Sequence, residues 1–269
     1  MIAFPNAKIN LGLRVLSKRI DGYHNIETVY YPVRWREALE IIPGKDSFKF
    51  AQTGLKVEVD EENNLCVKAW RLMKMKYKIP AVDMHLHKII PMGAGLGGGS
   101  SDAAFTIKLL NKLFELKLTD EDFEEVASEI GSDCAFFIRN KPVLARGKGN
   151  VFSQIEIDIS DFKIIIVKPE VGVITAEAYS KVIPVENESI VEIIKLKPIY
   201  WKEKLINDFE NVVFAMHPEI EAIKNILYES GAIYASMSGS GSAVYGIFEK
   251  EKNINEIKFD NCSVWAGDF

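Results

Sequence analysis

Glycine is concentrated in one stretch of this chain, and that stretch limits what the surrounding sequence can form. Five of the 18 glycines fall within seven positions that begin at Gly93, inside the run P-M-G-A-G-L-G-G-G-S-S-D-A-A, which starts at Pro91. Glycine lets backbone N–H groups approach a polyanion without an intervening Cβ atom, and it permits the positive φ angles of a tight turn. The stretch therefore predicts a phosphate-binding loop.

The residues on either side of this stretch predict a strand before it and a helix after it. Apolar and polar residues alternate over residues 82–90, which is typical of a half-buried strand. After the glycines come residues of the types that cap helices, and then apolar residues at spacings of three and four: Ser100, Ser101 and Asp102, then Ala103, Ile107, Leu110 and Phe114. The loop is thus expected to meet a helix N-terminus, where unpaired N–H groups and the helix dipole favour an anion.

Three known types of phosphate loop fit this stretch less well. In the Walker A pattern the lysine position falls on Gly99, so the side chain that would reach the phosphates is missing. The dinucleotide pattern G-x-G-x-x-G fits from Gly93, with Glu115 near the place of the ribose acid, but a second helical segment at residues 123–130 follows where a parallel strand is required. The H-R-D and D-F-G motifs of protein kinases do not occur.

The stretch resembles instead the ATP-binding loop of the GHMP small-molecule kinases (galactokinase, homoserine kinase, mevalonate kinase and phosphomevalonate kinase). A flexible glycine linker is the alternative, but a linker would not be followed by a capped amphipathic helix. The resemblance implies ATP and Mg²⁺, with Ser100 or Ser101 as a possible Mg²⁺ ligand and no metal site of the protein's own. The implied nucleotide-binding residues are Asn64, Lys88, Pro91, Met92, Gly93, Ala94, Gly95, Leu96, Gly97, Gly98, Gly99, Ser100 and Ser101.

Asn64 also has a simpler interpretation. It stands at the head of a predicted helix over residues 65–78, where an asparagine commonly caps the helix. Capping is the favoured role, and the resemblance adds a position near the nucleotide base.

A second motif lies near the N-terminus. Residues 7–16 alternate, so that Lys8 and Asn10 project from one face of a predicted strand, which on periodicity alone favours a solvent-facing side. The run N-A-K-I-N-L-G-L-R-V, followed by R-I-D-G-Y-H-N-I-E-T, is similar to the N-terminal signature of the GHMP branch that acts on a cytidine diphosphate-linked methylerythritol. Asn6 stands where that branch usually has proline.

This second resemblance implies how the small-molecule substrate is recognised. It assigns substrate binding to Asn10, Tyr23, His24, Thr175 and Tyr179, with aromatic side chains stacking on the cytosine base. For Tyr179 a core position on a short helix is an equally good interpretation. A mevalonate- or homoserine-type kinase would lack the D-G-Y-H element that begins at Asp21.

Two further segments resemble GHMP motifs. Ser132-Asp133-Cys134-Ala135-Phe136-Phe137 is similar to the family's G-A-D-x-P-F-F element, which implies Asp133 as the catalytic acid/base with Lys8 beside it; the pattern by itself also allows a helix cap. The Gly/Ser run over residues 236–242 is either a hairpin turn or the third GHMP motif, which packs against the phosphate loop. A GHMP-like sensor without catalysis should lack Lys8 or Asp133.

The alternating strand and helix patterns of the remaining sequence indicate an α+β or α/β chain, and the resemblance implies an α+β chain with the GHMP kinase fold. The resemblance implies an N-terminal domain like ribosomal protein S5 domain 2, a C-terminal ferredoxin-like domain and an active site between them; we place the boundary at residues 1–157 and 158–269. Strands are predicted at residues 38–42, 48–51, 55–59, 162–167, 233–235 and 243–248, and helices at 175–182, 201–214 and 218–230.

Charge and cysteine content narrow the functional class. The net charge of −5 argues against a nucleic-acid surface. No apolar run approaches the ~18 residues of a membrane span, and residues 1–8 do not resemble a signal peptide. Three separated cysteines favour reduced thiols, so we expect a cytoplasmic protein. We also expect a monomer or a weak homodimer.

Overall fold

The computed structural model describes residues 1–56, 60–185 and 189–269. The chain forms two compact units that each draw on separate stretches of sequence. Unit 1 comprises Met1–Ala7, Trp35–Met92 and Gly97–Lys141, and unit 2 comprises Lys8–Arg34, Gly93–Leu96 and Pro142–Phe269. The boundary between residues 157 and 158 stays a prediction for the two domains of the fold.

Unit 1 is built on a four-stranded sheet of order β1-β4-β6-β5. Its strands are β1 (Ile2–Ala3), β4 (Ala38–Pro43), β5 (Lys49–Gly54) and β6 (Val82–Lys88). The β4–β6 pair is antiparallel and the β5–β6 pair is parallel. The end of β6 leads toward the phosphate loop, as the alternating pattern predicts.

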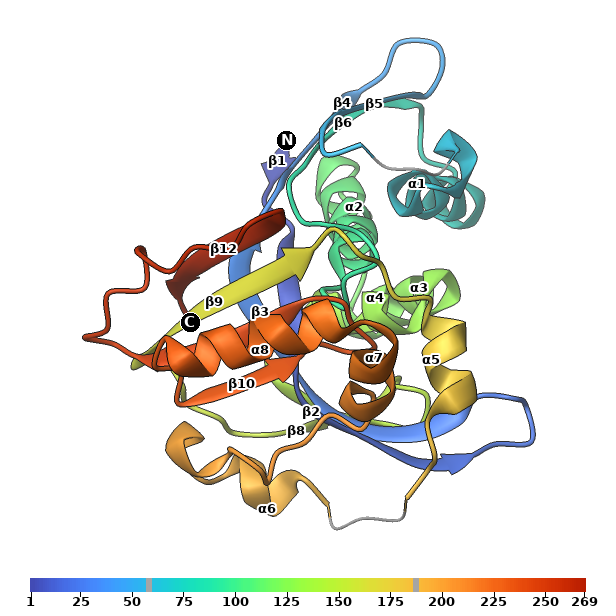
Figure 1. Ribbon diagram of the computed structural model, residues 1–269. Coiled ribbons are helices and arrows are strands. Elements are labelled where there is room, and N and C mark those ends of the chain that lie inside the picture. The colour runs from blue at the N-terminus through green and yellow to red at the C-terminus, as the bar shows by residue number, and fades with distance from the viewer. Residues whose placement is uncertain (57–59, 186–188) are drawn as a thin grey trace. The chain divides into compact units, whose positions relative to one another are not determined.

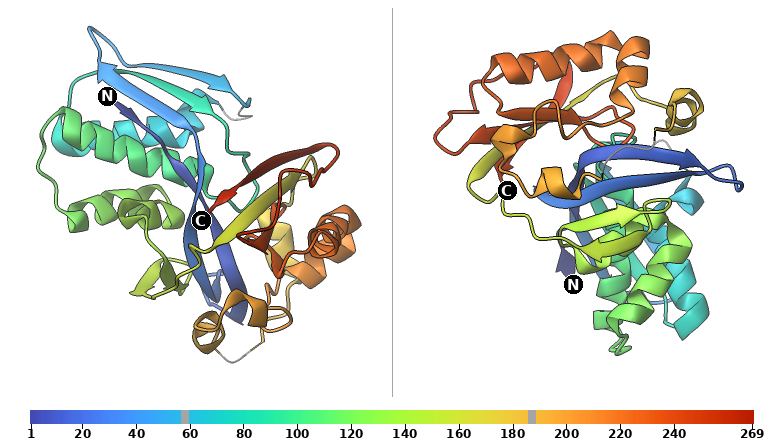
Figure 2. Two further views of the ribbon diagram at one scale, coloured as in Figure 1. Left: turned by 90° about the vertical axis from the view of Figure 1, so that its left-hand side faces the viewer. Right: turned by 90° about the horizontal axis from the view of Figure 1, so that it is seen from below.

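Helices α1 (Leu65–Tyr77) and α2 (Gly98–Leu113) lie on one face of this sheet, as Figures 1 and 2 show. Helices α3 (Asp120–Ile130) and α4 (Ser132–Arg139) pack against α2 on the side away from the sheet. Helix α2 packs on β4 and β1 and is flanked by α1 and α4, because its apolar positions recur along one side. The N-terminus of α3 forms a capping box between Thr119 and Asp122.

Unit 2 contains two four-stranded sheets, of order β2-β3-β7-β8 and β10-β11-β9-β12. Their strands are β2 (Asn6–Lys18), β3 (His24–Arg36), β7 (Val143–Arg146), β8 (Val151–Gln154), β9 (Phe162–Pro169), β10 (Tyr234–Met237), β11 (Val244–Glu249) and β12 (Cys262–Asp268). The unit's helices are α5 (Thr175–Lys181), α6 (Val191–Ile194), α7 (Glu210–Met216) and α8 (Pro218–Glu229). Figure 2 shows β2 and β3, in blue, as a long twisted hairpin.

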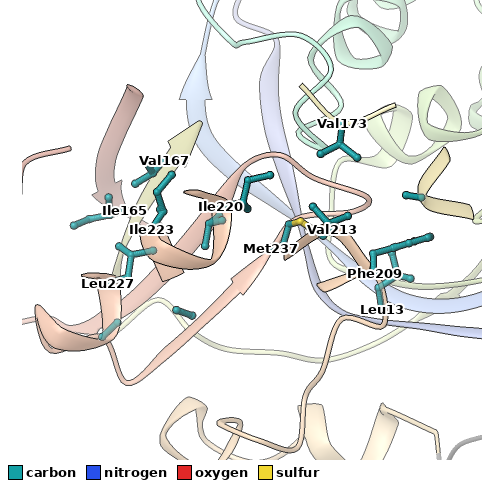
Figure 3. Close-up of a cluster of buried hydrophobic side chains, with 14 of the residues drawn as sticks. Leu13, Ile165, Val167, Val173, Phe209, Val213, Ile220, Ile223, Leu227 and Met237 are labelled. Carbon is teal, nitrogen blue, oxygen red and sulfur yellow. The ribbon is translucent and has the colours of Figure 1, made fainter. Parts of the chain in front are cut away.

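The core of unit 2 lies between the second sheet and helices α7 and α8 (Figure 3). Ile220, Ile223 and Leu227 form the buried side of α8, at spacings of three and four that place them on one helix face. They pack with Ile165 and Val167 from β9. Each such side chain contributes about 1.5–3 kcal/mol on full burial, so this layer holds α8 firmly on the sheet.

Several sequence expectations are wrong in detail. The helix predicted for residues 201–214 begins only at Glu210, because the side chain of Asn207 accepts a hydrogen bond from the Phe209 N–H and so favours a turn. Strands β3 and β12 were not anticipated. The strand predicted for residues 55–59 is not present at Leu55 and Lys56, and its remainder lies outside the described residues.

Among the described residues, every helix is too short or too polar to cross a membrane.

Candidate active site

The phosphate loop, residues 93–97, enters helix α2 directly. Gly93, Gly95 and Gly97 have φ angles of 60°, 74° and 69°, a region that favours glycine. Gly97 is the N-cap of α2, which starts at Gly98. The expectation that Ser100, Ser101 or Asp102 caps the helix is therefore wrong, because these residues already lie in its first turns.

The Gly/Ser segment forms the turn between β10 and β11 and contacts the phosphate loop. The Ser238 hydroxyl donates to the Gly95 carbonyl at 2.8 Å, and the Ala243 N–H donates to the Ala94 carbonyl at 3.2 Å. A Cβ atom on Gly95 would lie 2.0 Å from the Ser238 carbonyl oxygen. The predicted packing of this motif against the loop is confirmed, and it explains why position 95 needs glycine.

Lys8 is tied to the same loop. Its backbone N–H donates to the Leu96 carbonyl at 2.9 Å. Its Nζ donates to Asn10 Oδ1 at 2.6 Å and lies 4.7 Å from the centroid of the Tyr30 ring. The side chain is only 4% exposed. The strand face that carries Lys8 is therefore buried, contrary to the solvent-facing interpretation of the alternation.

Asn10 accepts a hydrogen bond from this ammonium group. Its Nδ2 donates to Thr28 Oγ1 at 3.0 Å, and its backbone N–H donates to Ser238 Oγ at 3.2 Å. The Tyr245 hydroxyl donates to its carbonyl at 2.8 Å. Asn10 thus joins Lys8, β3 and the Gly/Ser turn, while its predicted contact with the substrate stays a prediction.

In unit 1, Lys88 lies beneath the start of helix α2 in a buried ionic cluster. Its Nζ donates to Glu37 Oε1 at 2.6 Å and to Asp102 Oδ2 at 2.7 Å. Glu37 Oε2 also accepts from the N–H groups of Ile89 and Ile90, at 3.0 and 3.1 Å. Lys88 is 1% exposed, so its ammonium neutralises internal charge, and its predicted contact with the nucleotide stays untested.

Two carboxylates around one ammonium leave a surplus negative charge in this cluster. Burial raises the pKa of Asp102 well above its usual value. Burial lowers the pKa of Lys88, but the charges of Asp102 and Glu37 outweigh it and raise that pKa. Asp102 Oδ1 has no hydrogen-bond partner in the part of the chain that the structure describes. A proton on Asp102 therefore balances the charge of the cluster, with one carboxylate, Glu37, facing one ammonium, Lys88.

Asn64 caps helix α1 and also lines a surface hollow. Its Oδ1 accepts from the Cys66 N–H at 2.9 Å, which confirms the predicted capping role. A hollow of about 410 Å³ adjoins it, lined by Phe50, Gln52, Thr53, Gly54, Leu55, Lys56, Glu61 and Asn64. Polar and apolar groups meet there, as a purine base requires, so the predicted nucleotide contact remains open.

Asp133 lies in the first turn of α4, half-buried. Gly131 occupies the N-cap position, so the alternative in which Asp133 caps the helix is wrong. Ser132 and Ala135, which replace the alanine and proline of the family element, do not prevent the helix from forming. Asp133 belongs to unit 1 and Lys8 to unit 2, and their predicted proximity stays a prediction.

The structure brings two of the predicted substrate-binding residues together within unit 2. His24, the first residue of β3, stacks on Tyr179 of α5 with ring centroids 5.1 Å apart and an interplanar angle of 26°. Tyr179 also packs edge-on against Phe209 at 4.7 Å. Burial, followed by the charge of Lys18, lowers the pKa of His24, which favours the neutral imidazole.

Two more residues of this set, Tyr23 and Thr175, lie at the surface. Tyr23 is 61% exposed, with Lys148 Nζ 4.7 Å from its ring centroid. Thr175 begins α5, and its hydroxyl lies 3.0 Å from that of Ser240 in the Gly/Ser turn. An exposed aromatic ring near a stacked pair suits recognition of a planar base. Substrate binding by all of these residues stays a prediction.

Sequence reasoning missed three residues that support these groups. Thr28 holds Asn10, and Glu37 holds Lys88. Asn207 donates to the carbonyls of Met237 and Gly239, at 2.8 Å each, and so fixes the Gly/Ser turn. Each acts through a partner distant in sequence, so no local pattern marks it.

Comparisons with known proteins agree with this arrangement. Residues 64–141 match the family model of the GHMP kinases N-terminal domain, and residues 182–267 match that of the GHMP kinases C-terminal domain. A 4-diphosphocytidyl-2-C-methyl-D-erythritol kinase from Parabacteroides distasonis is 53% identical over 269 residues, which cover 99% of each chain. One of the same name from Cytophaga hutchinsonii is 52% identical over 250 residues, 92% of each chain.

Solved structures show the same fold. The crystal structure of a 4-(cytidine 5'-diphospho)-2C-methyl-D-erythritol kinase superposes with a TM-score of 0.84 at 28% identity, covering 99% of this chain and 98% of that one. The mevalonate kinase of Methanococcus jannaschii, at 18% identity and a TM-score of 0.75, covers 100% and 98% and shares the fold. The predicted GHMP kinase fold is confirmed. Since more than half of the aligned residues are identical to those of a relative that it matches over 99% of both chains, this chain belongs to the 4-diphosphocytidyl-2-C-methyl-D-erythritol kinase family of the GHMP kinases.

Proposed function

We propose that this chain transfers the γ-phosphoryl group of ATP to the 2-hydroxyl of 4-diphosphocytidyl-2-C-methyl-D-erythritol, a step of the non-mevalonate route to isoprenoid precursors. One observation carries the proposal. The phosphate loop at the start of α2 is bonded through the Leu96 carbonyl to Lys8, whose ammonium is held in place by Asn10. A loop that binds phosphate and a fixed cation next to it are what phosphoryl transfer needs.

The loop and helix α2 would bind the triphosphate through backbone N–H groups. The N-terminus of α2 carries the partial positive charge of the helix dipole, and it begins at Gly98 without a side chain in the way. The hollow next to Asn64 would accept the base of the nucleotide. Lys88 contributes indirectly, because its ion pairs fix the start of α2.

Asp133 would accept the proton of the acceptor hydroxyl or orient that hydroxyl toward the phosphorus atom. A positioned base of this kind contributes ~10²- to 10⁴-fold to the rate. Lys8 would stabilise the negative charge on the transferring phosphoryl group. The stack of His24 and Tyr179, together with Tyr23, would hold the cytosine end of the acceptor.

Mg²⁺ bound to ATP would neutralise charge on the phosphates. Serine hydroxyls at the start of α2 fit such an ion: Ser101 Oγ is buried and has no partner among the described residues, whereas Ser100 is partly exposed. Ser100 is therefore the better candidate ligand. We further propose a cytoplasmic location and a monomer or weak homodimer, in keeping with three separated cysteines and a net charge of −5.

The proposal is tested by measuring ADP release from Mg-ATP with 4-diphosphocytidyl-2-C-methyl-D-erythritol, mevalonate and homoserine in parallel. Turnover is expected with the cytidyl compound alone, with a product heavier by one phosphoryl group. Asp133→Asn should lower kcat by ~10²- to 10⁴-fold while the circular dichroism spectrum stays unchanged. Turnover of another alcohol would reject the assigned acceptor, and full activity of Asp133→Asn would reject the assigned base.

A further inference from the structure

Thr28 lies on β3 within hydrogen-bonding distance of Asn10 and is completely buried. Its hydroxyl donates to the carbonyl of Gly12 at 2.5 Å. A threonine hydroxyl has one proton, so once that proton is given to Gly12 the oxygen can only accept from its other neighbours. The group of Asn10 that faces Thr28, 3.0 Å away, must therefore be the NH₂ group.

This requirement determines which way the Asn10 amide points. The amide is planar, with oxygen on one side and nitrogen on the other, so that Nδ2 toward Thr28 turns Oδ1 toward Lys8. Lys8 Nζ donates to this oxygen at 2.6 Å. The opposite orientation would place NH₂ against the ammonium of Lys8 and leave two donors facing each other. The orientation thus follows from the hydrogen-bond network itself.

A second contact fixes the backbone of Asn10. Ser238 Oγ gives its proton to the Gly95 carbonyl at 2.8 Å and accepts from the Asn10 N–H at 3.2 Å. The strand position that carries Asn10 is therefore tied to the phosphate loop. What remains variable is the rotation of the Asn10 side chain, and Thr28 controls it.

We propose that Thr28 is a positioning residue for phosphoryl transfer, which acts by orienting the Asn10 amide so that its oxygen holds the Lys8 ammonium beside the phosphate loop. This inference rests on the proposed function of Lys8. Because Thr28 is completely buried, a bound nucleotide does not reach it, and its effect is expected in the chemical step. A displacement of about 1 Å in a catalytic group can cost ~10²-fold in rate.

The decisive variant is Thr28→Val, which keeps the shape of the side chain and removes the hydroxyl. We expect kcat to fall about 10- to 100-fold while KM for ATP changes less than about threefold. Thr28→Ser, which keeps the hydroxyl, should restore most of the lost kcat. Thr106→Val is the matched control, because Thr106 is equally buried and donates to a backbone carbonyl, that of Asp102, at 2.8 Å.

A double-mutant cycle separates positioning from a general structural effect. If Thr28 acts through Lys8, then Thr28→Val should change kcat by less than about twofold in a Lys8→Met background, whereas independent effects would multiply. Equal losses in both backgrounds would overturn the proposal. Lys8→Met with wild-type activity would instead reject the proposed role of Lys8, and absence of turnover by the wild type would reject the proposed function.

The wild-type protein offers a test that needs no variant. A neutron crystal structure shows the deuterium atoms of the Asn10 amide and the Thr28 hydroxyl directly. We expect the amide nitrogen of Asn10 to point toward Thr28 and the hydroxyl deuterium of Thr28 to point toward the Gly12 carbonyl. An amide oxygen of Asn10 facing Thr28 would overturn the proposal. This test does not depend on whether the Thr28→Val variant folds.

Discussion

Replacement of Lys88 by methionine should be among the most damaging single changes in unit 1. The side chains of Lys88, Glu37 and Asp102 are 1%, 0% and 4% exposed, and the two carboxylates are 2.6 and 2.7 Å from the ammonium. Lys88→Met retains most of the side-chain volume but leaves two acidic groups buried without their cation. Breaking a buried ion pair in this way costs about 3–5 kcal/mol.

That cost converts to a measurable change in melting temperature. At about 2–4 °C per kcal/mol for a chain of this size, Lys88→Met should melt roughly 6–20 °C below the wild type. Thermal unfolding followed by circular dichroism measures it directly. The matched variant Asp102→Asn has the same size, keeps an oxygen for Lys88 and cannot ionise, so below pH ~4, where the carboxyl is protonated in both the folded and the unfolded state, we expect it to change stability by less than about 1 kcal/mol.

The pH dependence provides an independent check. Since burial raises the pKa of Asp102, the folded state keeps this proton at pH values where the unfolded chain, with a pKa of about 3.9, has lost it. The stabilisation from this carboxyl is complete below pH ~4 and is lost as the pH rises through the folded-state pKa. Asp102→Asn cannot lose a proton, so its melting temperature should rise relative to that of the wild type as the pH increases above ~4.

Two results would refute this reasoning. One is a Lys88→Met protein that melts within about 2 °C of the wild type, which would show that the buried carboxylates tolerate the loss of the cation. The other is an Asp102→Asn protein as unstable as Lys88→Met, which would show that both carboxylates are ionised and required. Agreement of both variants and the pH trend would establish Lys88 as an internal countercharge below the start of α2.

Two further predictions concern the loop and the acceptor. Gly95→Ala should destabilise the protein and raise KM for ATP far more than Gly93→Ala. A Cβ atom at position 95 would lie 2.0 Å from the Ser238 carbonyl oxygen, whereas a Cβ atom at position 93 meets no atom within 4 Å and adds only the cost of about 1–2 kcal/mol for a positive φ. Equal losses in the two variants would show that the contact with Ser238 is unimportant. Tyr179→Ala should raise KM for the acceptor about 2- to 13-fold and leave KM for ATP unchanged. Since burial lowers the pKa of His24, KM for the acceptor should be constant from pH ~7 to ~9, and a titration in that range would contradict a neutral imidazole.

Local patterns were sufficient where a residue's role depends on its immediate neighbours. The clustered glycines from Gly93 predict a phosphate loop because close approach of backbone to an anion needs residues without side chains. The cap at Asn64 was predicted because it involves an N–H group only two residues away, that of Cys66. The Asp21-Gly22-Tyr23-His24 element identified the branch of the family through its resemblance.

The tertiary structure decided the features that depend on distant partners. Alternation in β2 indicated only that Lys8 and Asn10 share a face, and β3 made that face buried by placing Thr28 and Tyr30 against it. Glu37 and Lys88 pair across 51 positions of sequence, and Asn10 and Ser238 across 228. The amino-acid sequence by itself determined the phosphate loop, its helix and the family. The orientation of Lys8 and the buried charge beneath α2 arise only when segments far apart in sequence meet in an interior without water, because buried polar groups there need hydrogen-bond partners.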